Sequence, residues 1–156
     1  LFRTLLLERV SRNHTQKTAV MDKNAVNVIL FDGVCNLCNG FVQFLIKQDS
    51  KGSFKFASLQ SQSAQDLLLT ENMSADRFDS VVYISGGEVW QKSAAVLRIL
   101  NDVGGLWKMF YVLIIIPRII SDAVYDFVAT NRYRMFGKRQ ECMVPTDELR
   151  SRFLED

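Results

Sequence analysis

The stretch "VNVILFDGVCNLCNGF", residues 26–41, decides the fold because it joins a buried strand to a helix. Its first half is a nearly continuous apolar run rich in β-branched residues, which is typical of a strand covered on both faces. A helix follows, indicated by large apolar residues at helical spacing: Leu37, Phe41, Phe44 and Leu45. We expect this helix to end near residues 49–52, so that Cys35 and Cys38 lie at its N-terminus.

The next part of the chain repeats the order of strand and helix. Residues 54–59, "FKFASL", alternate as a strand does, and residues 61–69, "SQSAQDLLL", combine a serine cap with a leucine-rich helical segment. Strand, helix, strand and helix in this order predict a parallel crossover within one β-sheet.

A hairpin and a third helix complete the pattern. Residues 80–85, "SVVYIS", and residues 88–91, "EVWQ", are joined by two glycines, which predicts a β-hairpin. The helix after it is expected to have Ser93 as its cap, to end at Gly104 and to present one apolar face, formed by Val96, Ile99, Leu100 and Val103. The predicted fold is therefore α/β, with a β-α-β-α-β-β-α core and additional C-terminal helices.

Residues 106–120, "LWKMFYVLIIIPRII", are strongly apolar. The uninterrupted run 109–116 is far shorter than the ~20 residues that span a bilayer, so we expect a buried helix packed against the sheet. Peripheral contact with a membrane surface, or docking in a partner's groove, is the alternative. After Pro117 a second helical stripe follows, formed by Ile119, Ile120, Ala123, Val124, Phe127 and Val128.

The composition narrows the class of protein. The chain has 156 residues, of which 48% are hydrophobic and 23% charged, so it suits one globular domain. A formal net charge of +2 gives no reason to expect a nucleic-acid partner. Three cysteines, an odd number, indicate a reducing compartment rather than a disulfide-stapled fold, and we expect a cytoplasmic protein.

Residues 1–20 differ from the rest of the chain. They are basic, lack the apolar core and cleavage site of a secretory signal, and contain His14, the one histidine. We interpret them as a leader or non-native extension, dispensable for fold and redox chemistry; a transit-peptide remnant, and so an organelle, is the alternative. Residues 21–145 then form the domain and residues 146–156 a C-terminal tail.

The spacing of Cys35 and Cys38 is suited to thiol–disulfide exchange. The positive end of the helix dipole and the unpaired N–H groups there lower the pKa of a thiol, and Cys35 has that position, which predicts a nucleophile. Cys38, one turn into the helix, can then resolve a mixed disulfide. A zinc site lacks a second pair of ligands, since only Cys142 and His14 remain. Inert buried thiols fit the polar turn less well, because Asn36 and Asn39 favour an exposed one.

Several segments resemble the DCC family of predicted thiol-disulfide oxidoreductases, named for an Asp-x-x-Cys-x-x-Cys signature. They are "FDGVCNLCNGFVQFLIKQD", "FKFASLQS", "KSAAVLRIL" and "DAVYDFVATNRYRMFGKR", followed by a later cysteine. The resemblance runs from about residue 26 to residue 145 and implies a thioredoxin-like fold. It places the signature on Asp32, Cys35 and Cys38, and implies a reaction class rather than a substrate.

Asp32 has two physical roles open to it. At the end of a buried strand, its carboxylate can accept a proton from the resolving thiol, or it can cap the turn by accepting backbone N–H bonds. The first role requires a partly buried carboxyl whose pKa is raised. The second is the usual behaviour of an aspartate in a turn.

The segment before the predicted strand 80–85 departs from thioredoxin. Thioredoxins carry a proline before the strand that faces the cysteines, whereas Asp79 or Ser80 stands near that place here, so thioredoxin's way of docking protein substrates is not expected to carry over.

The basic run Arg132, Arg134, Lys138 and Arg139 lies close to Cys142 in the sequence. We favour a solvated basic flank with a spare cysteine; a tail folded over the first helix, with cations beside the thiolate, is the alternative.

The sequence thus predicts a thiol-disulfide oxidoreductase of the protein-disulfide reductase type. Its catalytic residues are expected to be Cys35, Cys38 and Asp32, with no cofactor and no metal. The expected partners are a disulfide-containing protein or small thiol and an electron donor. A non-enzymatic or membrane-associated binding module that retains the fold is the alternative, and reversible oxidation of the two cysteines distinguishes them.

Overall fold

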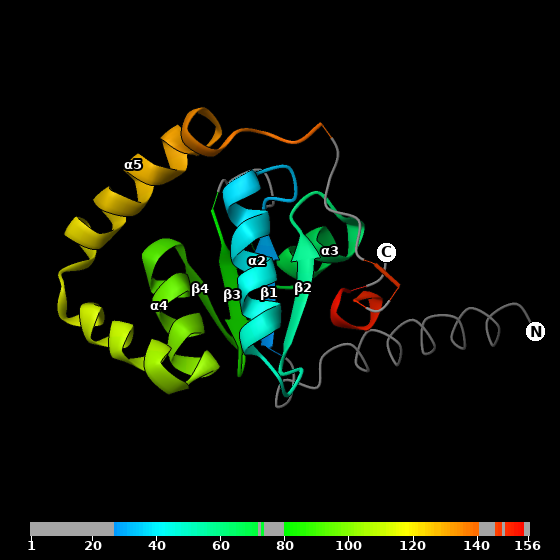
Figure 1. The fold of residues 1–156 in the computed structure, drawn as a ribbon, viewed down its shortest axis with the longest axis horizontal. Coiled ribbons are helices and arrows are strands. Elements are labelled where there is room, and N and C mark those ends of the chain that lie inside the picture. Colours follow the sequence, from blue (N-terminus) through cyan, green and yellow to red (C-terminus); the bar gives the residue numbers. More distant parts are fainter. Residues whose placement is uncertain (1–26, 72, 74–79, 141–145, 148, 155–156) are drawn as a thin grey trace, which may run out of the picture.

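The computed structural model describes residues 27–71, 73, 80–140, 146–147 and 149–154, so the leader predicted at residues 1–20 lies outside the described residues. Along the chain the elements are β1 (Asn27–Phe31), α2 (Asn36–Gln48), β2 (Phe54–Ser58), α3 (Gln62–Thr70), β3 (Val82–Ser85), β4 (Glu88–Gln91), α4 (Lys92–Val103), the 3-10 helix η2 (Gly105–Ile115), α5 (Arg118–Phe136) and the 3-10 turn η3 (Arg150–Arg152). This order confirms the predicted thioredoxin-like α/β fold (Figure 1).

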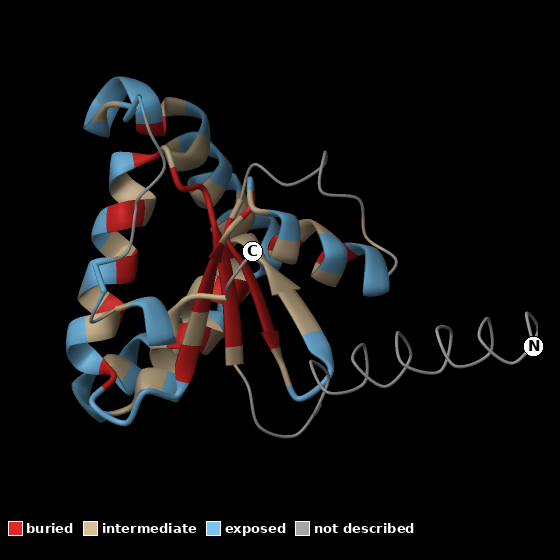
Figure 2. Cartoon of the chain, turned by 90° about the vertical axis from the view of Figure 1, so that its right-hand side faces the viewer, coloured by how far each residue is buried: buried red, intermediate tan, exposed pale blue. Residues whose placement is uncertain are grey.

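One four-stranded sheet, in the order β2-β1-β3-β4, forms the centre. β1 pairs in parallel with β2 and antiparallel with β3, and β3 pairs antiparallel with β4. Ile29 and Phe31 belong to a core cluster with α2 and α4, whereas Val28 and Leu30 belong to a second cluster with α3. β1 is therefore buried on both faces, as its apolar run predicts, and Figure 2 shows the central strands as mainly buried.

Local signals set the ends of several elements. The side chain of Ser61 caps α3 by accepting a hydrogen bond from the Ala64 amide at 3.2 Å, which confirms the serine cap. Gly86 and Gly87 have φ angles of 59° and 81°, as a tight hairpin turn between β3 and β4 requires. The cap predicted at Ser93 is wrong, because the N-cap of α4 is Gln91, two residues earlier, and the Ser93 hydroxyl donates to a carboxylate of α5 instead.

The buried stripe of α2 differs in part from the predicted one. Leu45 is fully buried together with Val42, whereas Phe41 and Phe44 are only partly buried beside the core. Phe44 also contacts η2, where its ring meets the ring of Trp107 edge-on at 4.7 Å between centroids.

The expectation of a buried helix at residues 106–120 is wrong. η2 contains no buried residue, and it runs along α4, where the guanidinium of Arg98 donates to the Tyr111 hydroxyl at 2.7 Å. The reason is geometric, since α2 and α4 already cover one face of the sheet and α3 the other. Within the described part of the chain, no helix is long and apolar enough to cross a membrane.

The described C-terminal residues pack back on β2. The backbone amide of Leu154 donates to the carbonyl of Phe56 at 2.9 Å, and the Phe153 ring contacts Phe31 and Phe56 with centroid distances of 6.3 and 5.8 Å. Arg152 adds a salt bridge of 2.5 Å to a buried carboxylate at the end of α2. These contacts close the edge of the sheet beside β2.

Candidate active site

The two cysteines lie where β1 passes into α2. Cys35 is the N-cap residue of α2, Cys38 lies one turn into the helix, and both thiols are free. Cys35 is 0% exposed and Cys38 is partly exposed. The exposed turn expected from the flanking residues is therefore wrong for Cys35 and for Asn39, which is 2% exposed and donates to the carbonyl of Gly33 at 2.9 Å.

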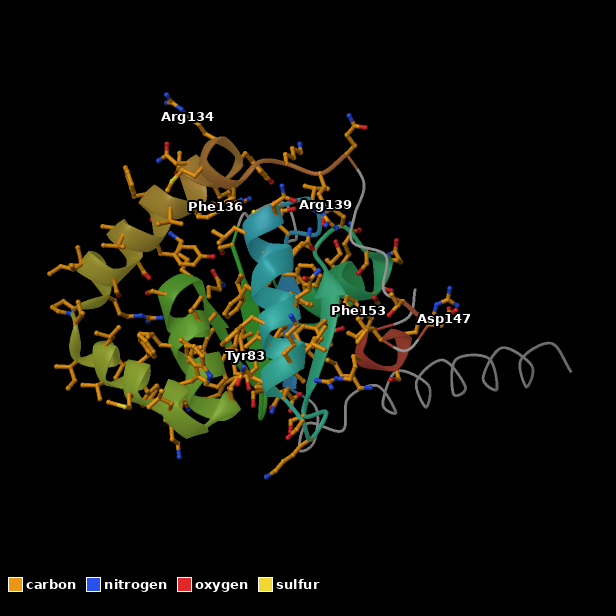
Figure 3. The ribbon with its side chains drawn as sticks, viewed as in Figure 1. Tyr83, Arg134, Phe136, Arg139, Asp147 and Phe153 are labelled. Atoms are coloured by element: carbon orange, nitrogen blue, oxygen red, sulfur yellow. The ribbon has the colours of Figure 1, made fainter. Side chains whose placement is uncertain are left out.

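A segment from the other end of the domain covers Cys35. We call residues 136–139 the covering segment; Figure 3 labels its ends, Phe136 and Arg139, near the N-terminal end of α2. The amide of Arg139 donates to the carbonyl of Val34 at 2.8 Å, and the Asn36 side chain donates to the carbonyl of Phe136 at 2.9 Å. Cys35 itself forms an antiparallel β-bridge with Lys138, so the backbone of the covering segment pairs with the backbone at the start of α2.

The carboxylate of Asp32, at the end of β1, is fully hydrogen-bonded. Oδ1 accepts from the Val34 amide at 3.1 Å and from Gln60 Nε2 at 3.0 Å. Oδ2 accepts from Arg132 Nη2 at 3.0 Å and from the Tyr133 hydroxyl. Asp32 and Arg132 are both buried, so this is an ion pair held inside the protein.

These contacts decide the ionisation of Asp32. Burial alone raises the pKa of the Asp32 carboxyl, but the hydrogen bonds from Tyr133, the Val34 amide and Gln60, together with the charge of Arg132, outweigh it and lower the pKa. The raised pKa required of a proton-accepting Asp32 is thus absent in this reduced state. The contact required of a turn-capping Asp32, the bond from the Val34 amide, is present.

The environment of Cys38 favours its protonated thiol. Burial, the electrostatic interaction with Cys35 and a hydrogen bond to Cys35 raise the pKa of Cys38 to about 12, while the charge of Arg132 opposes this rise. A thiol that keeps its proton at neutral pH can donate it in a hydrogen bond to a neighbouring thiolate. Cys38 is therefore expected to keep its proton in the reduced protein at neutral pH.

The favoured interpretation of the basic run as a solvated flank is wrong for Arg132. Its side chain is buried against Asp32, while Arg134, Lys138 and Arg139 are exposed. The segment after α5 thus folds over the start of α2, as the alternative proposed. Of the four basic residues, only Arg132 is buried in the site. Cys142 lies outside the described residues.

Sequence reasoning missed Gln60 and Tyr133. Gln60 holds the loop in two ways, since its amide donates to Asp32 and its Oε1 accepts from the Gly33 amide at 3.1 Å. Tyr133 has the Arg132 guanidinium over its ring, 4.8 Å from the centroid. No local pattern in the sequence indicates either residue, because each joins the site through a contact with the distant Asp32.

The chain before β3 is held by α5. The amide of Val81 donates to the hydroxyl of Tyr125 at 3.0 Å, so this backbone donor is occupied from within the protein. Ser80 is described and Asp79 lies outside the described residues. Metal ligands are a separate question. Within the described ranges no group of three or more His, Cys, Asp or Glu side chains is placed to hold a metal ion.

Comparisons with known proteins identify the family of this chain. The sequence pattern of the DCC1-like thiol-disulfide oxidoreductase family matches residues 29–138. The protein YuxK of Bacillus subtilis (strain 168) is 48% identical over 127 residues, covering 81% of this chain and 93% of that protein. A chloroplastic DCC family protein of Arabidopsis thaliana is 39% identical over 116 residues, covering 74% of this chain and 67% of that protein. No solved structure matches the chain significantly.

Proposed function

Since the chain belongs to the DCC1-like thiol-disulfide oxidoreductase family, we propose that it exchanges electrons with disulfides through Cys35 and Cys38. The observation that carries this proposal is the unequal environment of the two thiols at the start of α2. The pKa of Cys38 is raised to about 12, partly by a hydrogen bond to Cys35, so Cys38 keeps its proton while Cys35 reacts.

The reaction proceeds in two balanced steps. The Cys35 thiolate attacks one sulfur of a substrate disulfide, forming a mixed disulfide and releasing the other sulfur as a thiolate. The Cys38 thiol then loses its proton to that released thiolate and attacks the Cys35 sulfur, which releases the second substrate thiolate. The dithiol loses two electrons, the substrate disulfide gains them, and Cys35 and Cys38 end as a disulfide.

Asp32 acts as a positioning residue in this proposal. Its pKa is lowered and its oxygens are engaged by donors from three parts of the chain, so it is a poor acceptor for the Cys38 proton. It holds Arg132 beside Cys38, where the positive charge favours the thiolate that forms in the second step. Without Arg132, the negative charge of Asp32 opposes that thiolate.

Substrate access requires the covering segment to move. Cys35 is 0% exposed while residues 136–139 pair with the start of α2, so no disulfide reaches its sulfur in this conformation. The weakest of these contacts is the backbone bond from the Asn36 amide to the Gly137 carbonyl, at 3.5 Å. Opening of this segment is therefore part of the proposed cycle.

Equilibration in glutathione redox buffers tests the proposal. The chain is mixed with buffers of increasing oxidised fraction, quenched with acid and alkylated, and the state of each cysteine is read by peptide mass spectrometry. We expect Cys35 and Cys38 to oxidise together and reversibly, and Cys142→Ser to leave the midpoint unchanged. Failure of the pair to oxidise within physiological potentials would favour a binding module that retains the fold. In cells, Cys38→Ser is expected to trap substrates as mixed disulfides on Cys35.

A further inference from the structure

The helix α5 leaves large apolar side chains exposed, unlike an ordinary surface helix. Three of its polar side chains contact the rest of the protein: Asp122 accepts from the Ser93 hydroxyl, the half-exposed Asp126 accepts from Lys92 Nζ at 3.0 Å, and Tyr125 accepts from the backbone before β3. An ordinary surface helix buries its apolar stripe and exposes its polar one. The surroundings that suit the outward side of α5 are therefore apolar.

The outward side of α5 continues into η2 as one apolar surface. Figure 1 shows both elements outside α4, at the edge of the molecule away from α3. We call the most exposed large apolar side chains of η2 and α5 the outer face; they are Leu106, Met109, Val112, Ile115, Ile119, Val124 and Phe127, each at least 61% exposed. A soluble monomer rarely exposes so many large apolar residues together, which indicates an interaction site.

The aromatic residues of η2 that carry polar atoms turn inward. Trp107 packs against Phe44 and its indole N–H donates to Gln48 Oε1 at 3.4 Å, while the Tyr111 hydroxyl accepts from Arg98. What remains on the outer face is mainly aliphatic. Protein interfaces are enriched in tyrosine, tryptophan and arginine anchors, so this surface resembles the apolar side of a helix that enters lipid.

The basic and the acidic side chains near the outer face differ in their partners. Lys108 and Arg118 are exposed, and among the described residues neither forms an ion pair with an acid. The acidic residues of η2 and α5, Asp122 and Asp126, are engaged by α4. A second copy docked face to face would add further cations without a free acid, whereas an anionic lipid surface complements them.

We infer that the outer face docks on an anionic phospholipid membrane. The aliphatic side chains enter the boundary of the acyl chains, and Lys108 and Arg118 lie among the headgroups. The inward side of the same helix carries Arg132 to the candidate active site. Docking would therefore hold the dithiol of this protein close to the bilayer, although the inference does not depend on the redox chemistry.

Flotation of the full-length reduced chain with vesicles tests this inference. We expect it to float with vesicles of phosphatidylcholine mixed with phosphatidylglycerol, and less with phosphatidylcholine alone. The double variant Ile119→Ser and Phe127→Ser should weaken binding at least about tenfold, because two exposed apolar side chains are lost. Leu69→Ser is the matched control, since Leu69 is 65% exposed on α3 and should not affect binding.

A second pair of variants tests the electrostatic part. Lys108→Gln and Arg118→Gln should each weaken binding to the anionic vesicles about fivefold and leave the weak binding to phosphatidylcholine unchanged. Wild-type behaviour of the Ile119→Ser and Phe127→Ser variant on vesicles would overturn the inference. A second result would also overturn it: the wild-type chain does not bind the vesicles, light scattering shows a dimer, and the double variant is a monomer. The outer face would then be an interface with a second copy.

Discussion

The guanidinium of Arg132 lies 3.0 Å from the carboxylate of Asp32, and the side chains of both are more than nine-tenths buried although they are 100 residues apart in the sequence. This ion pair links α5 to the end of β1, directly before the first cysteine. A buried charge left without its partner is costly, so the pair couples the packing of α5 to the structure of the site.

Replacing Arg132 tests this coupling. We expect Arg132→Met to lower the free energy of unfolding by about 3–5 kcal/mol, because the Asp32 carboxylate stays buried without its counter-charge. Urea unfolding at neutral pH measures the loss. Arg134→Met, two residues along the same helix, is the control, since Arg134 is exposed and its loss should change stability by no more than about 0.5 kcal/mol. Equal effects of the two variants would contradict the assignment.

Stability in acid should depend on Asp32. Because the pKa of Asp32 is lowered on folding, its contribution is present above the unfolded value of about 3.9 and is lost as the pH falls through the lowered folded value. In Asp32→Asn this part of the pH dependence should be missing, so the free energy of unfolding should vary less with pH below about 4. An unchanged slope in a series of urea titrations would show that Asp32 has an ordinary pKa.

The reactivity of Cys38 should depend on Cys35. In the reduced protein Cys38 should react slowly with iodoacetamide through about pH 9, because its pKa is raised to about 12. Cys35→Ala removes the electrostatic interaction and the hydrogen bond that Cys35 provides, so the pKa of Cys38 should fall while burial still keeps it above the usual range. Alkylation rates against pH, read at the Cys38 peptide, measure both. A faster reaction of Cys38 than of Cys35 in the wild type would reverse their proposed roles.

Loosening the covering segment should expose Cys35. Asn36→Ala removes the side-chain hydrogen bond of 2.9 Å to the Phe136 carbonyl, a contact of about 0.5–1.5 kcal/mol, so alkylation of Cys35 should accelerate about two- to tenfold. Gln43→Ala, on the exposed side of the same helix, should have no such effect. Equal alkylation rates in wild type and Asn36→Ala would mean that this bond does not control access to the sulfur.

The described C-terminal residues should contribute to stability. Phe153→Ala removes a ring that contacts Phe31 and Phe56, and because Phe153 is only partly buried we expect a loss of about 1–3 kcal/mol. Thermal or urea unfolding measures it. Phe127→Ala removes a ring that is 66% exposed and should leave stability nearly unchanged, which separates loss of packing from loss of an aromatic residue.

By itself the sequence determined the order of strands and helices, the hairpin at its two glycines and the place of Cys35 and Cys38 at the start of a helix. These features depend on periodicity and turn chemistry within a few residues, which local sequence carries in full. The burial of Cys35, the entry of Arg132 into the site and the exposure of η2 were decided only by the tertiary structure. Each depends on which elements, far apart in the chain, cover a given surface: residues 136–139 cover the first cysteine, whereas the sheet that η2 was expected to cover is already occupied by α2, α3 and α4. An apolar pattern states that a surface avoids water, but it does not state what covers that surface.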